Sequence, residues 1–489
     1  MANKSQELKV AIVHYHLKRG GVTRVIESAR DILKANGSRV LILSGEAARD
    51  DADQTDIRVV SGLNYRKTGN SVIAGSLVEA LKKEAIAHFG SLPDVWHFHN
   101  PTLAKNVLIP TVIKELAEED ARIVLQLHDF AEDGRPGNYT SQRSFFDSEA
   151  SFEATLYPVA KQIHYATINQ RDHDFLRKAG INRSNLHVIP NAITELKVES
   201  KPEDRPFCQD KLFALYPTRG IRRKNIGELL LLALLYGDRI EFATTLSPEN
   251  PEWKEVHDGW AAAVKELELP VTLGIADDGK YSFLDLLGWS DFVVTTSIGE
   301  GFGLAFLEPW TAGKSVVGRD LPEITRDFVK NDLKLDHLYP RIDFPVEWLN
   351  EVEVKEAVES MLRRSYLAYD SVLPKNAVKQ ALKSWVKRGR IDFGVLNESM
   401  QLSVLRKLKE DPSLMSFVSM PSMELASEET VRNHCRTISE VYSPERYGES
   451  LKALYEAAMK GHAGRVTHLS TDSVLAQFLN PARLNLLRD

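Results

Sequence analysis

Cysteine is scarce in this sequence, which excludes a disulfide scaffold and a cysteine-rich zinc site. The 489 residues include only Cys208 and Cys435, and no Cys-x-x-Cys pair occurs. This usage is typical of proteins from a reducing compartment. Residues 1–9 are too polar for a signal peptide, whose apolar core would have to start about there. We therefore expect a cytoplasmic protein.

Long apolar runs and an excess of positive charge are also missing. The longest apolar run, residues 229–236, is far shorter than the roughly 20 residues that cross a bilayer. Lys and Arg total 62 against 68 Asp and Glu, a net charge of −6, so we expect neither nucleic-acid binding nor membrane association. The 43% of hydrophobic and 27% of charged residues are typical of a globular chain, whose length allows two or three domains.

The first part of the chain alternates predicted strands and helices. A strand over 10–13, a glycine break, a helix over 22–35 and a strand over 40–43 form a βαβ unit, which indicates a parallel sheet. Further strands are expected over 95–98, 123–127, 165–168 and 187–190. We predict an amino-terminal Rossmann-like domain over residues 1–197 and a charged, proline-containing linker over 198–211.

The alternation restarts after the linker and then becomes helical. Strands are predicted over 213–216, 240–243, 271–273 and 292–295, and helices over 225–236, 253–266 and 284–287. From residue 346 onward the pattern turns helical, without a further strong strand series, and helices are predicted over 354–367, 375–388, 398–409, 427–438 and 444–460. We predict a second Rossmann-like domain over 212–440 with a helical insertion at about 346–430, and then a final helix and tail over 441–489. Two such α/β halves predict a ligand-binding cleft between them.

Two short motifs follow predicted strands. Gly20 and Gly21 allow backbone N–H groups to approach a phosphate or sugar at a helix N-terminus, although a plain tight turn explains them equally well. Arg24 takes the place of the third glycine of a dinucleotide fingerprint. Arg219 and Lys224 lie five positions apart in a basic loop that suits a diphosphate, the alternative being a solvated loop.

The third motif is the run from Glu300 to Glu308, which holds a glycine turn between a strand and a helix. The N–H groups of Phe302, Gly303 and Leu304, after Gly301, are predicted to point at an anion. The two carboxylates suit the hydroxyls of a sugar on one side and a ribose on the other. Two surface acids beside a helix cap would be the alternative.

Together these motifs resemble those of family 4 glycosyltransferases, which have the GT-B fold of two Rossmann-like domains facing across a cleft. Glu300 and Glu308 match the E-x7-E element of that family, and Arg219 and Lys224 match its Arg-x4-Lys pair. Further similarities lie in Gly20-Gly21, in Leu127-His128-Asp129 and in residues 188–193, Val-Ile-Pro-Asn-Ala-Ile. The motifs occur in the family's order over residues 8–325. By the resemblance, the helix after residue 441 crosses back onto the first domain.

The resemblance implies a retaining transfer of a hexose from a UDP-, GDP- or ADP-sugar to a hydroxyl, without an obligatory metal or cofactor. Arg219 and Lys224 would then bind the diphosphate and Glu308 the ribose. Glu300 and the backbone of residues 301–304 would hold the sugar, with Gly20 and Gly21 also on the donor side. His128 would lie near the reacting face, which makes it catalytic together with Glu300, Arg219 and Lys224.

The acceptor side is expected to include His99, Asn100, Arg135 and Tyr139, and we expect a soluble acceptor such as a sugar or a small organic acid. His97 and His99 share a strand face and offer two metal ligands, but no third is apparent. Asp51-Ala-Asp53 has the form of a DxD metal motif, but its surroundings indicate a solvated charge run.

The sequence alone leaves two classes of function open. The chain is either a glycosyltransferase or a non-catalytic protein that binds a nucleotide sugar. Within enzymes, a phosphorylase or an epimerase on the same fold is the rival. A helix stripe of Leu77, Leu81, Ala85 and Phe89 is expected to face the core rather than a membrane. The donor base, the acceptor and the oligomeric state do not follow from the sequence.

Overall fold

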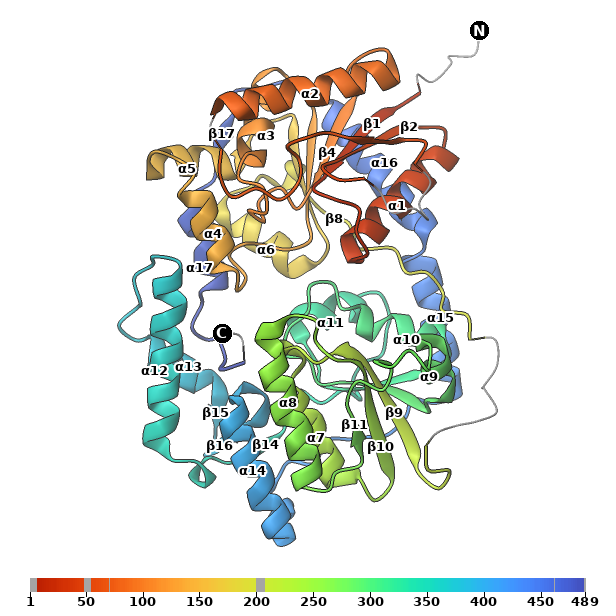
Figure 1. Cartoon of the computed structure of the whole chain (residues 1–489), viewed down its shortest axis with the longest axis vertical. Helices are drawn as coiled ribbons and strands as arrows, with labels where there is room; N and C mark the ends of the chain where they lie inside the picture. Colours follow the sequence, from red (N-terminus) through yellow and green to blue (C-terminus); the bar gives the residue numbers. More distant parts are fainter. Residues whose placement is uncertain (1–6, 48–53, 70, 199–206, 461, 488–489) are drawn as a thin grey trace. The chain divides into compact units, whose positions relative to one another are not determined.

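A computed structural model describes residues 7–47, 54–69, 71–198, 207–460 and 462–487 of the chain. The chain divides into two compact units. The first comprises residues 1–192 and 442–479, and the second comprises 193–441 and 480–489. Each unit contains a parallel sheet with helices beside it, which confirms the predicted α/β class (Figure 1).

The first unit is built on a sheet of seven strands in the order β3-β2-β1-β4-β5-β7-β8. All neighbours pair in parallel, and Val10 of β1 lies opposite Val40 and Val95. The strands are β1 Lys9–His14, β2 Arg39–Ser44, β3 Ile57–Val59, β4 Val95–His99, β5 Ile123–Leu127, β7 Ile163–Thr167 and β8 Leu186–Val188. Their carboxyl ends therefore meet at one edge, where ligands of such sheets bind.

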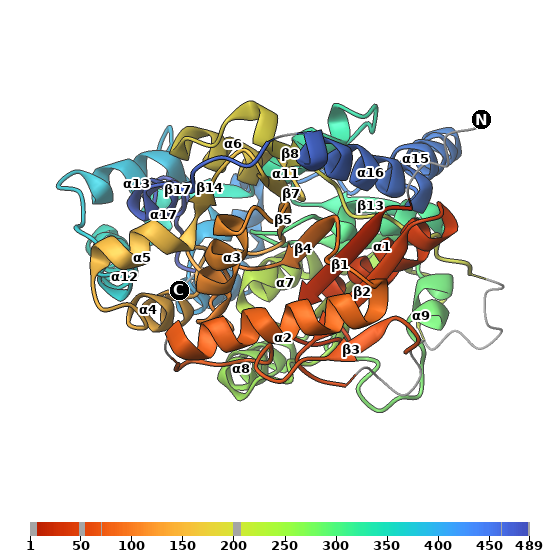
Figure 2. The same ribbon diagram turned by 90° about the horizontal axis from the view of Figure 1, so that it is seen from above.

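Helices cover both faces of this sheet (Figure 2). On one face, α1 and α16 pack together over Ile12 and Ile42 through residues such as Ile26 and Leu451. On the other face lie α2 and α3, whose apolar sides are buried. The helices are α1 Gly21–Ala35, α2 Ser71–Phe89, α3 Ile109–Glu118, α4 Pro136–Arg143, α5 Glu149–Leu156, α6 Gln170–Ala179, α16 Pro444–Lys460 and α17 Thr471–Phe478.

Two expectations for this unit are settled by burial and pairing. The α2 stripe of Leu77, Leu81, Ala85 and Phe89 is at most 4% exposed, so this helix faces the core as predicted. The tail also forms regular structure. Strand β17 (Thr467–His468) pairs antiparallel with β6 (Pro158–Val159), and α17 packs on α6. In the described part of the chain, no helix has the length and apolarity to span a membrane.

The second unit contains a five-stranded parallel sheet in the order β11-β10-β9-β12-β13. Its strands are β9 Leu212–Arg219, β10 Ile240–Leu246, β11 Val271–Thr272, β12 Phe292–Thr295 and β13 Ser315–Gly318. The helices around it are α7 Ile226–Tyr236, α8 Pro251–Glu266, α9 Phe283–Trp289, α10 Glu308–Thr311 and α11 Pro322–Val329. The order places β9 and β12, which precede the two charged motifs, side by side in the sheet.

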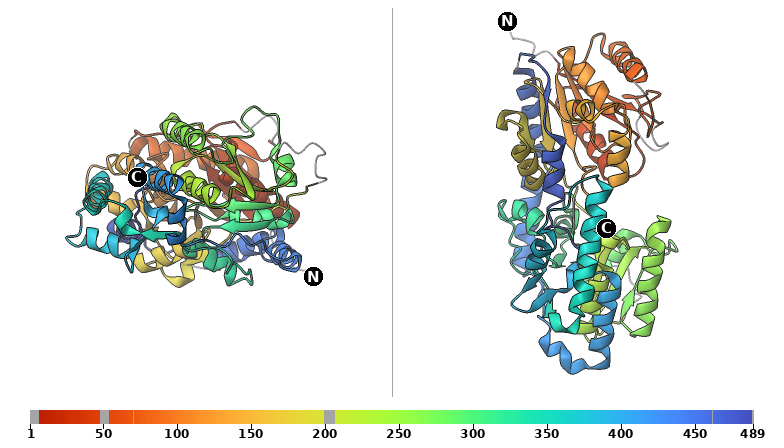
Figure 3. Two further views of the ribbon diagram at one scale, coloured as in Figure 1. Left: turned by 90° about the horizontal axis from the view of Figure 1, so that it is seen from below. Right: turned by 90° about the vertical axis from the view of Figure 1, so that its left-hand side faces the viewer.

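The region beyond residue 346 is mainly helical, as predicted, but it also contains short strands that the sequence pattern did not indicate. An antiparallel sheet of β14 (Asp343–Pro345), β16 (Arg390–Asp392) and β15 (Val386–Lys387) lies in this region. The helix predicted over 375–388 ends at Trp385, because Arg388 and Gly389 take positive φ and turn the chain into a hairpin. The helices are α12 Glu351–Ala368, α13 Ala377–Trp385, α14 Glu398–Glu410 and α15 Glu428–Val441, and α14 packs on α7 (Figure 3).

Candidate active site

In the second unit, the loops after β9 and β12 are hydrogen-bonded to each other. The backbone N–H of Ile298 donates to the carbonyl of Arg223 at 2.9 Å, and the hydroxyl of Thr296 donates to the carbonyl of Lys224 at 3.0 Å. The basic loop and the glycine-rich loop are therefore fixed side by side at the carboxyl edge of the sheet, where parallel α/β sheets bind ligands.

Lys224 and Glu300 form an ion pair at this edge. Their side chains are only 16% and 10% exposed. Burial alone would raise the pKa of Glu300, but the positive charges of Lys224 and Arg223, together with hydrogen bonds from Lys224 and Ser297, lower it. Glu300 is therefore a carboxylate at neutral pH. The sequence motifs predicted both residues, and the structure brings them together.

The other two charged residues of the motifs, Arg219 and Glu308, interact with different partners. Arg219 is the last residue of β9, and its Nη1 lies 2.7 Å from Oε1 of Glu249; both side chains are about half exposed or more. Glu308 begins α10 and accepts a 2.7 Å hydrogen bond from the Thr311 hydroxyl at its backbone carbonyl. Arg219 thus lies at the predicted edge of the sheet, paired with a carboxylate that the motifs did not single out.

The turn between the two glutamates depends on Gly303. This residue has φ = +94°, and a Cβ atom there would come within 2.9 Å of Cγ2 of Ile324. Phe302 is buried and packs edge-on against Phe328, with ring centroids 5.9 Å apart. Packing and backbone conformation thus require a glycine at position 303, whether or not an anion binds at Gly301 and its neighbours.

The helix predicted after this turn is divided into two short pieces, which corrects the expected geometry. A 3₁₀ helix, η3, covers Leu304–Phe306, and α10 has only four residues. Glu308 therefore begins the second of these pieces and is separated from the glycine turn by the first. A helix this short has little dipole, so any anion at the turn depends on individual backbone N–H groups.

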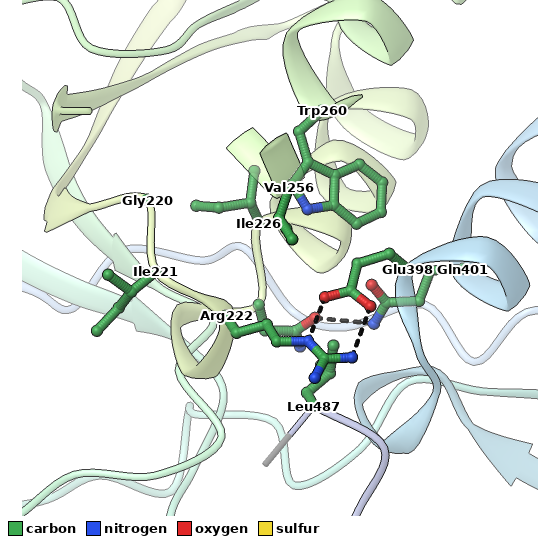
Figure 4. Close-up of a pocket in the computed structure, with 10 residues that line it drawn as sticks. Gly220, Ile221, Arg222, Ile226, Val256, Trp260, Glu398, Gln401 and Leu487 are labelled. Atoms are coloured by element: carbon green, nitrogen blue, oxygen red, sulfur yellow. Dashed lines mark hydrogen bonds and ion pairs between the residues drawn. The ribbon is translucent and has the colours of Figure 1, made fainter. Parts of the chain in front are cut away.

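Side chains from distant segments hold the basic loop in place (Figure 4). Arg222 donates from Nε and Nη2 to both carboxylate oxygens of Glu398, at 2.6 and 2.9 Å, and from Nη2 to the carbonyl of Leu486 at 3.1 Å. Gln401 donates to Oδ1 of Asn225 at 2.8 Å, and Asn225 takes a positive φ of 53°. Helix α14 and the last described residues thus fix both flanks of Lys224.

A buried ionic network continues from this loop into the core of the second unit. The Arg319 guanidinium donates to Glu228 at 2.5–3.1 Å and to both oxygens of Asp392 at 2.9 Å, and Asn225 donates to Glu228 at 2.8 Å. Tyr339 adds a 2.9 Å hydrogen bond to Glu228. The network joins the parallel sheet, through β13 and α7, to the added antiparallel sheet at β16.

Glu398 and Gln401 are positioning residues that the sequence did not reveal. Each lies 176 positions from its partner in the basic loop, so no local spacing connects them. The only local signal, the Asn397 cap at the start of α14, marks a helix boundary and carries no information about the loop.

In the first unit, four buried histidines lie near the carboxyl edge of the sheet. The rings of His97 and His99 stack with centroids 4.4 Å apart, and those of His99 and His128 stack at 5.2 Å. Nδ1 of His99 and Nε2 of His128 are hydrogen-bonded at 2.9 Å, and Nδ1 of His97 is 2.8 Å from the Tyr455 hydroxyl of α16. His14 contacts the carbonyl of His99 at 3.3 Å.

These histidines are neutral at physiological pH. Burial lowers the pKa of His14 and His97 to about 3 and that of His128 to about 4, the last against the opposing charge of Asp129. Burial, followed by the charges of its histidine neighbours, lowers the pKa of His99 well below its usual value. His128 is therefore available as a hydrogen-bond donor or acceptor rather than as a cation.

The residues predicted for the acceptor side differ in exposure. Asn100 is buried with φ = 53°, its side-chain oxygen accepts from the N–H groups of His128 and Asp129, and its carbonyl accepts from Tyr15. Tyr139 is buried against Phe152. Arg135 is partly exposed and lies 2.7 Å from Asp129.

Gly20 and Gly21 lie at the start of α1, as predicted. Gly20 is extended, and a Cβ atom at Gly21 would meet nothing within 4 Å. Neither conformation nor packing within the unit demands a glycine at these positions, which is compatible with a ligand that approaches the backbone there.

No group of three or more His, Cys, Asp or Glu side chains in the described ranges has a geometry that could hold a metal ion. His97 and His99 share a strand face, as expected, but they lie against each other and against Tyr455. Asp51 and Asp53 lie outside the described residues.

The amino-terminal part of the chain matches the family model "Glycosyltransferase Family 4" over residues 19–195. Over these residues the chain is similar to that family. The match includes Gly20, Gly21, His97, His99 and His128. The resemblance that the motifs suggested is thereby confirmed.

A curated relative covers both units. Mannosylglucosyl-3-phosphoglycerate synthase of Petrotoga mobilis is 28% identical over an alignment of 428 residues that covers 80% of this chain and 79% of that protein. The family match and this relative together confirm the prediction of a glycosyltransferase.

Solved structures share the fold. The sucrose-phosphate synthase of Thermosynechococcus elongatus aligns over 92% of this chain and 98% of its own, with a TM-score of 0.52 and 14% identity. Anabaena HepE in complex with UDP aligns over 92% of this chain and 100% of its own, with a TM-score of 0.52 and 12% identity. These likenesses confirm the predicted GT-B fold.

Proposed function

We propose that this protein transfers a hexose, with retention of anomeric configuration, from a nucleotide diphosphate sugar to a hydroxyl of a small anionic acceptor. The observation that carries the proposal is the buried Lys224–Glu300 pair at the carboxyl edge of the second sheet. It holds a cation and a hydroxyl-binding carboxylate in a fixed relation, as a sugar diphosphate requires.

The proposed reaction breaks the bond between the anomeric carbon and the diphosphate oxygen. Lys224 and Arg219 stabilise the negative charge that develops on the leaving diphosphate, and N–H groups at residues 302–304 assist. Glu300 binds sugar hydroxyls. The acceptor oxygen bonds to the anomeric carbon on the same face, and its proton passes to the departing phosphate oxygen. No protein nucleophile and no metal are needed in this scheme.

The substrate class is proposed from the curated relative, whose name specifies a mannosylglucosyl-3-phosphoglycerate product. We propose a GDP-hexose or UDP-hexose donor and an acceptor related to glucosyl-3-phosphoglycerate. Such an acceptor carries both a sugar and a small organic acid, the two types expected from the sequence.

A thermal-shift screen of the whole chain against GDP-mannose, GDP-glucose, UDP-glucose and ADP-glucose tests donor binding. A ligand at 100 times its Kd adds about 2.7 kcal/mol of stability. The best donor is then incubated with glucosyl-3-phosphoglycerate in EDTA, and the product's anomeric configuration is read by NMR. Retention with full activity in EDTA supports the proposal.

Inversion, or strict dependence on added metal, contradicts the corresponding part of the mechanism. If the protein binds the donor but neither transfers the sugar nor slowly hydrolyses the donor, a non-catalytic nucleotide-sugar-binding protein is favoured. Turnover that requires inorganic phosphate as the co-substrate favours a phosphorylase.

A further inference from the structure

Three loops of the first unit converge beyond the carboxyl ends of its central strands. The backbone N–H of Arg66 donates to the carbonyl of Lys105 at 2.8 Å, and the N–H of Val107 donates to the carbonyl of Arg66 at 3.0 Å. The Asn138 side chain donates to the carbonyl of Leu103 at 3.0 Å. The segments around residues 65, 105 and 137 therefore form one hydrogen-bonded surface.

Each loop contributes a cation to this surface: Lys67, Lys105 and Arg135. The Lys105 ammonium lies 5.1 Å from the centre of the Tyr65 ring, and the Tyr65 hydroxyl is 2.8 Å from Nε2 of His16. Among the described residues, neither Lys67 nor Lys105 forms an ion pair, whereas Arg135 is paired with Asp129. Lys105 is nevertheless partly buried.

Lys105 lies within the electrostatic influence of the other two cations. Burial lowers the pKa of Lys105, and the charges of Arg135 and Lys67 lower it further, against the opposing charge of Asp129. Holding like charges together in a chain of net charge −6 is unfavourable unless an anion offsets them. The ring of Tyr65, half exposed beside Lys105, adds an apolar wall to the same surface.

We propose that Lys67, Lys105 and Arg135 bind the phosphate of the acceptor, a phosphate monoester of a small hydroxy acid. This inference rests on the proposed function for the acceptor's role in transfer, but not for anion binding itself. Arg135 was expected on the acceptor side from the sequence; Lys67 and Lys105 were not. The three loops follow different strands and meet at one place. In this proposal the site therefore recognises a compact anion and not an extended chain.

The test measures binding of 3-phosphoglycerate, glycerate and inorganic phosphate to the whole chain by calorimetry. Lys105→Met keeps the aliphatic stem and removes the charge, Lys105→Arg restores the charge, and Lys83→Ala on the exposed side of α2 is the matched control. We expect wild type to bind 3-phosphoglycerate more tightly than glycerate. Lys105→Met should weaken that binding at least about tenfold, as for loss of one charge-assisted contact.

Lys105→Arg and Lys83→Ala should bind 3-phosphoglycerate within about twofold of wild type. Adding Lys67→Ala to Lys105→Met should abolish the preference over glycerate. Equal affinity of wild type and Lys105→Met for 3-phosphoglycerate, or no measurable binding to wild type, overturns the proposal. Inorganic phosphate that binds as tightly as 3-phosphoglycerate also overturns it, because the site would then recognise a free ion.

Nucleotide-sugar binding, measured by thermal shift on the same samples, reports on the proposed function separately. The variants should keep wild-type shifts with the donor. A wild type that binds 3-phosphoglycerate but no nucleotide sugar would refute the glycosyl transfer and leave the anion site standing. Normal donor shifts together with an unchanged 3-phosphoglycerate affinity in Lys105→Met would refute the anion site and leave the proposed glycosyl transfer standing.

Discussion

In the first unit, four buried histidines lie near the carboxyl edge of the sheet. His97, His99 and His128 stack on one another, and His14 contacts the backbone carbonyl of His99. The corresponding edge of the second unit is built from charges that are neutralised in pairs, Lys224 with Glu300 and Arg222 with Glu398. Burial disfavours charge at both places, but the four histidines stay un-ionised, whereas the charged side chains of the second unit are compensated by partners. The two edges should therefore fail under different conditions.

The largest expected difference between the two units is in how their stability responds to acid. The histidines have a pKa of about 6.5 when unfolded and about 3 to 4 when folded at His14, His97 and His128. Between these values the unfolded state binds more protons, so the free energy of unfolding decreases as the pH is lowered from 6.5 towards 4. The slope is up to about 1.4 kcal/mol per pH unit for each histidine.

Hydrogen exchange at pH 7 and pH 5, corrected for chemical exchange rates, should show amides of β1, β4 and β5 losing protection while those of β9 and β12 keep theirs. In the second unit, Glu300 and Asp392 have lowered pKa values, so their contribution is lost only below about pH 4.5. Glu132, whose pKa burial raises to about 7, acts against the histidines between pH 4.5 and 7. Equal loss of protection in both units would contradict the comparison.

Removing the centre of the buried network should test charge compensation directly. Arg319→Met leaves Glu228 and Asp392 without their shared cation in a fully buried place. We expect a loss of about 3–5 kcal/mol in the free energy of unfolding, measured by urea denaturation. Arg406→Met removes an exposed two-bond pair with Glu266 and should cost far less, because solvent screens exposed ion pairs. Equal costs would mean that burial does not set the value of these pairs.

Lys224→Ala tests whether the charged edge serves the chemistry. We expect turnover with the true donor to fall about 100-fold or more, because one charge-assisted contact to a developing charge is worth a few kcal/mol. The exposed Lys254→Ala on α8 is the control and should keep wild-type turnover. Unchanged turnover in Lys224→Ala, with an unchanged melting temperature, would remove this residue from the site.

The regular parts of both units could be predicted because their signal is local. The strand over 123–127 is bounded as predicted, since four of its five residues, Ile-Val-Leu-Gln-Leu, are apolar and two of them are β-branched. The strands at 343–345, 386–387 and 390–392 were missed because two or three residues carry no period, and their pairing depends on a turn at positive φ.

The same limit separates the two halves of the candidate site. Lys224 and Glu300 were predicted because each belongs to a motif with fixed spacing. Glu398 and Gln401, which position the basic loop, and Lys105, which neighbours Lys67 only through a loop pairing, have no such spacing. Tertiary structure alone brings them to the site.

A smaller effect should distinguish hydrogen-bonded from unpaired polar groups within the neutral edge. Tyr455 and Tyr447 lie on α16, both buried against the histidine face of the sheet. The Tyr455 hydroxyl is hydrogen-bonded to Nδ1 of His97, whereas the Tyr447 hydroxyl has no hydrogen bond of normal geometry within the described residues. Tyr455→Phe should therefore cost about 1–2 kcal/mol in urea denaturation at pH 7, and Tyr447→Phe close to zero. Because both changes remove one hydroxyl from one helix, equal costs would mean that the His97 contact contributes nothing specific and that α16 is held to the sheet by apolar packing alone.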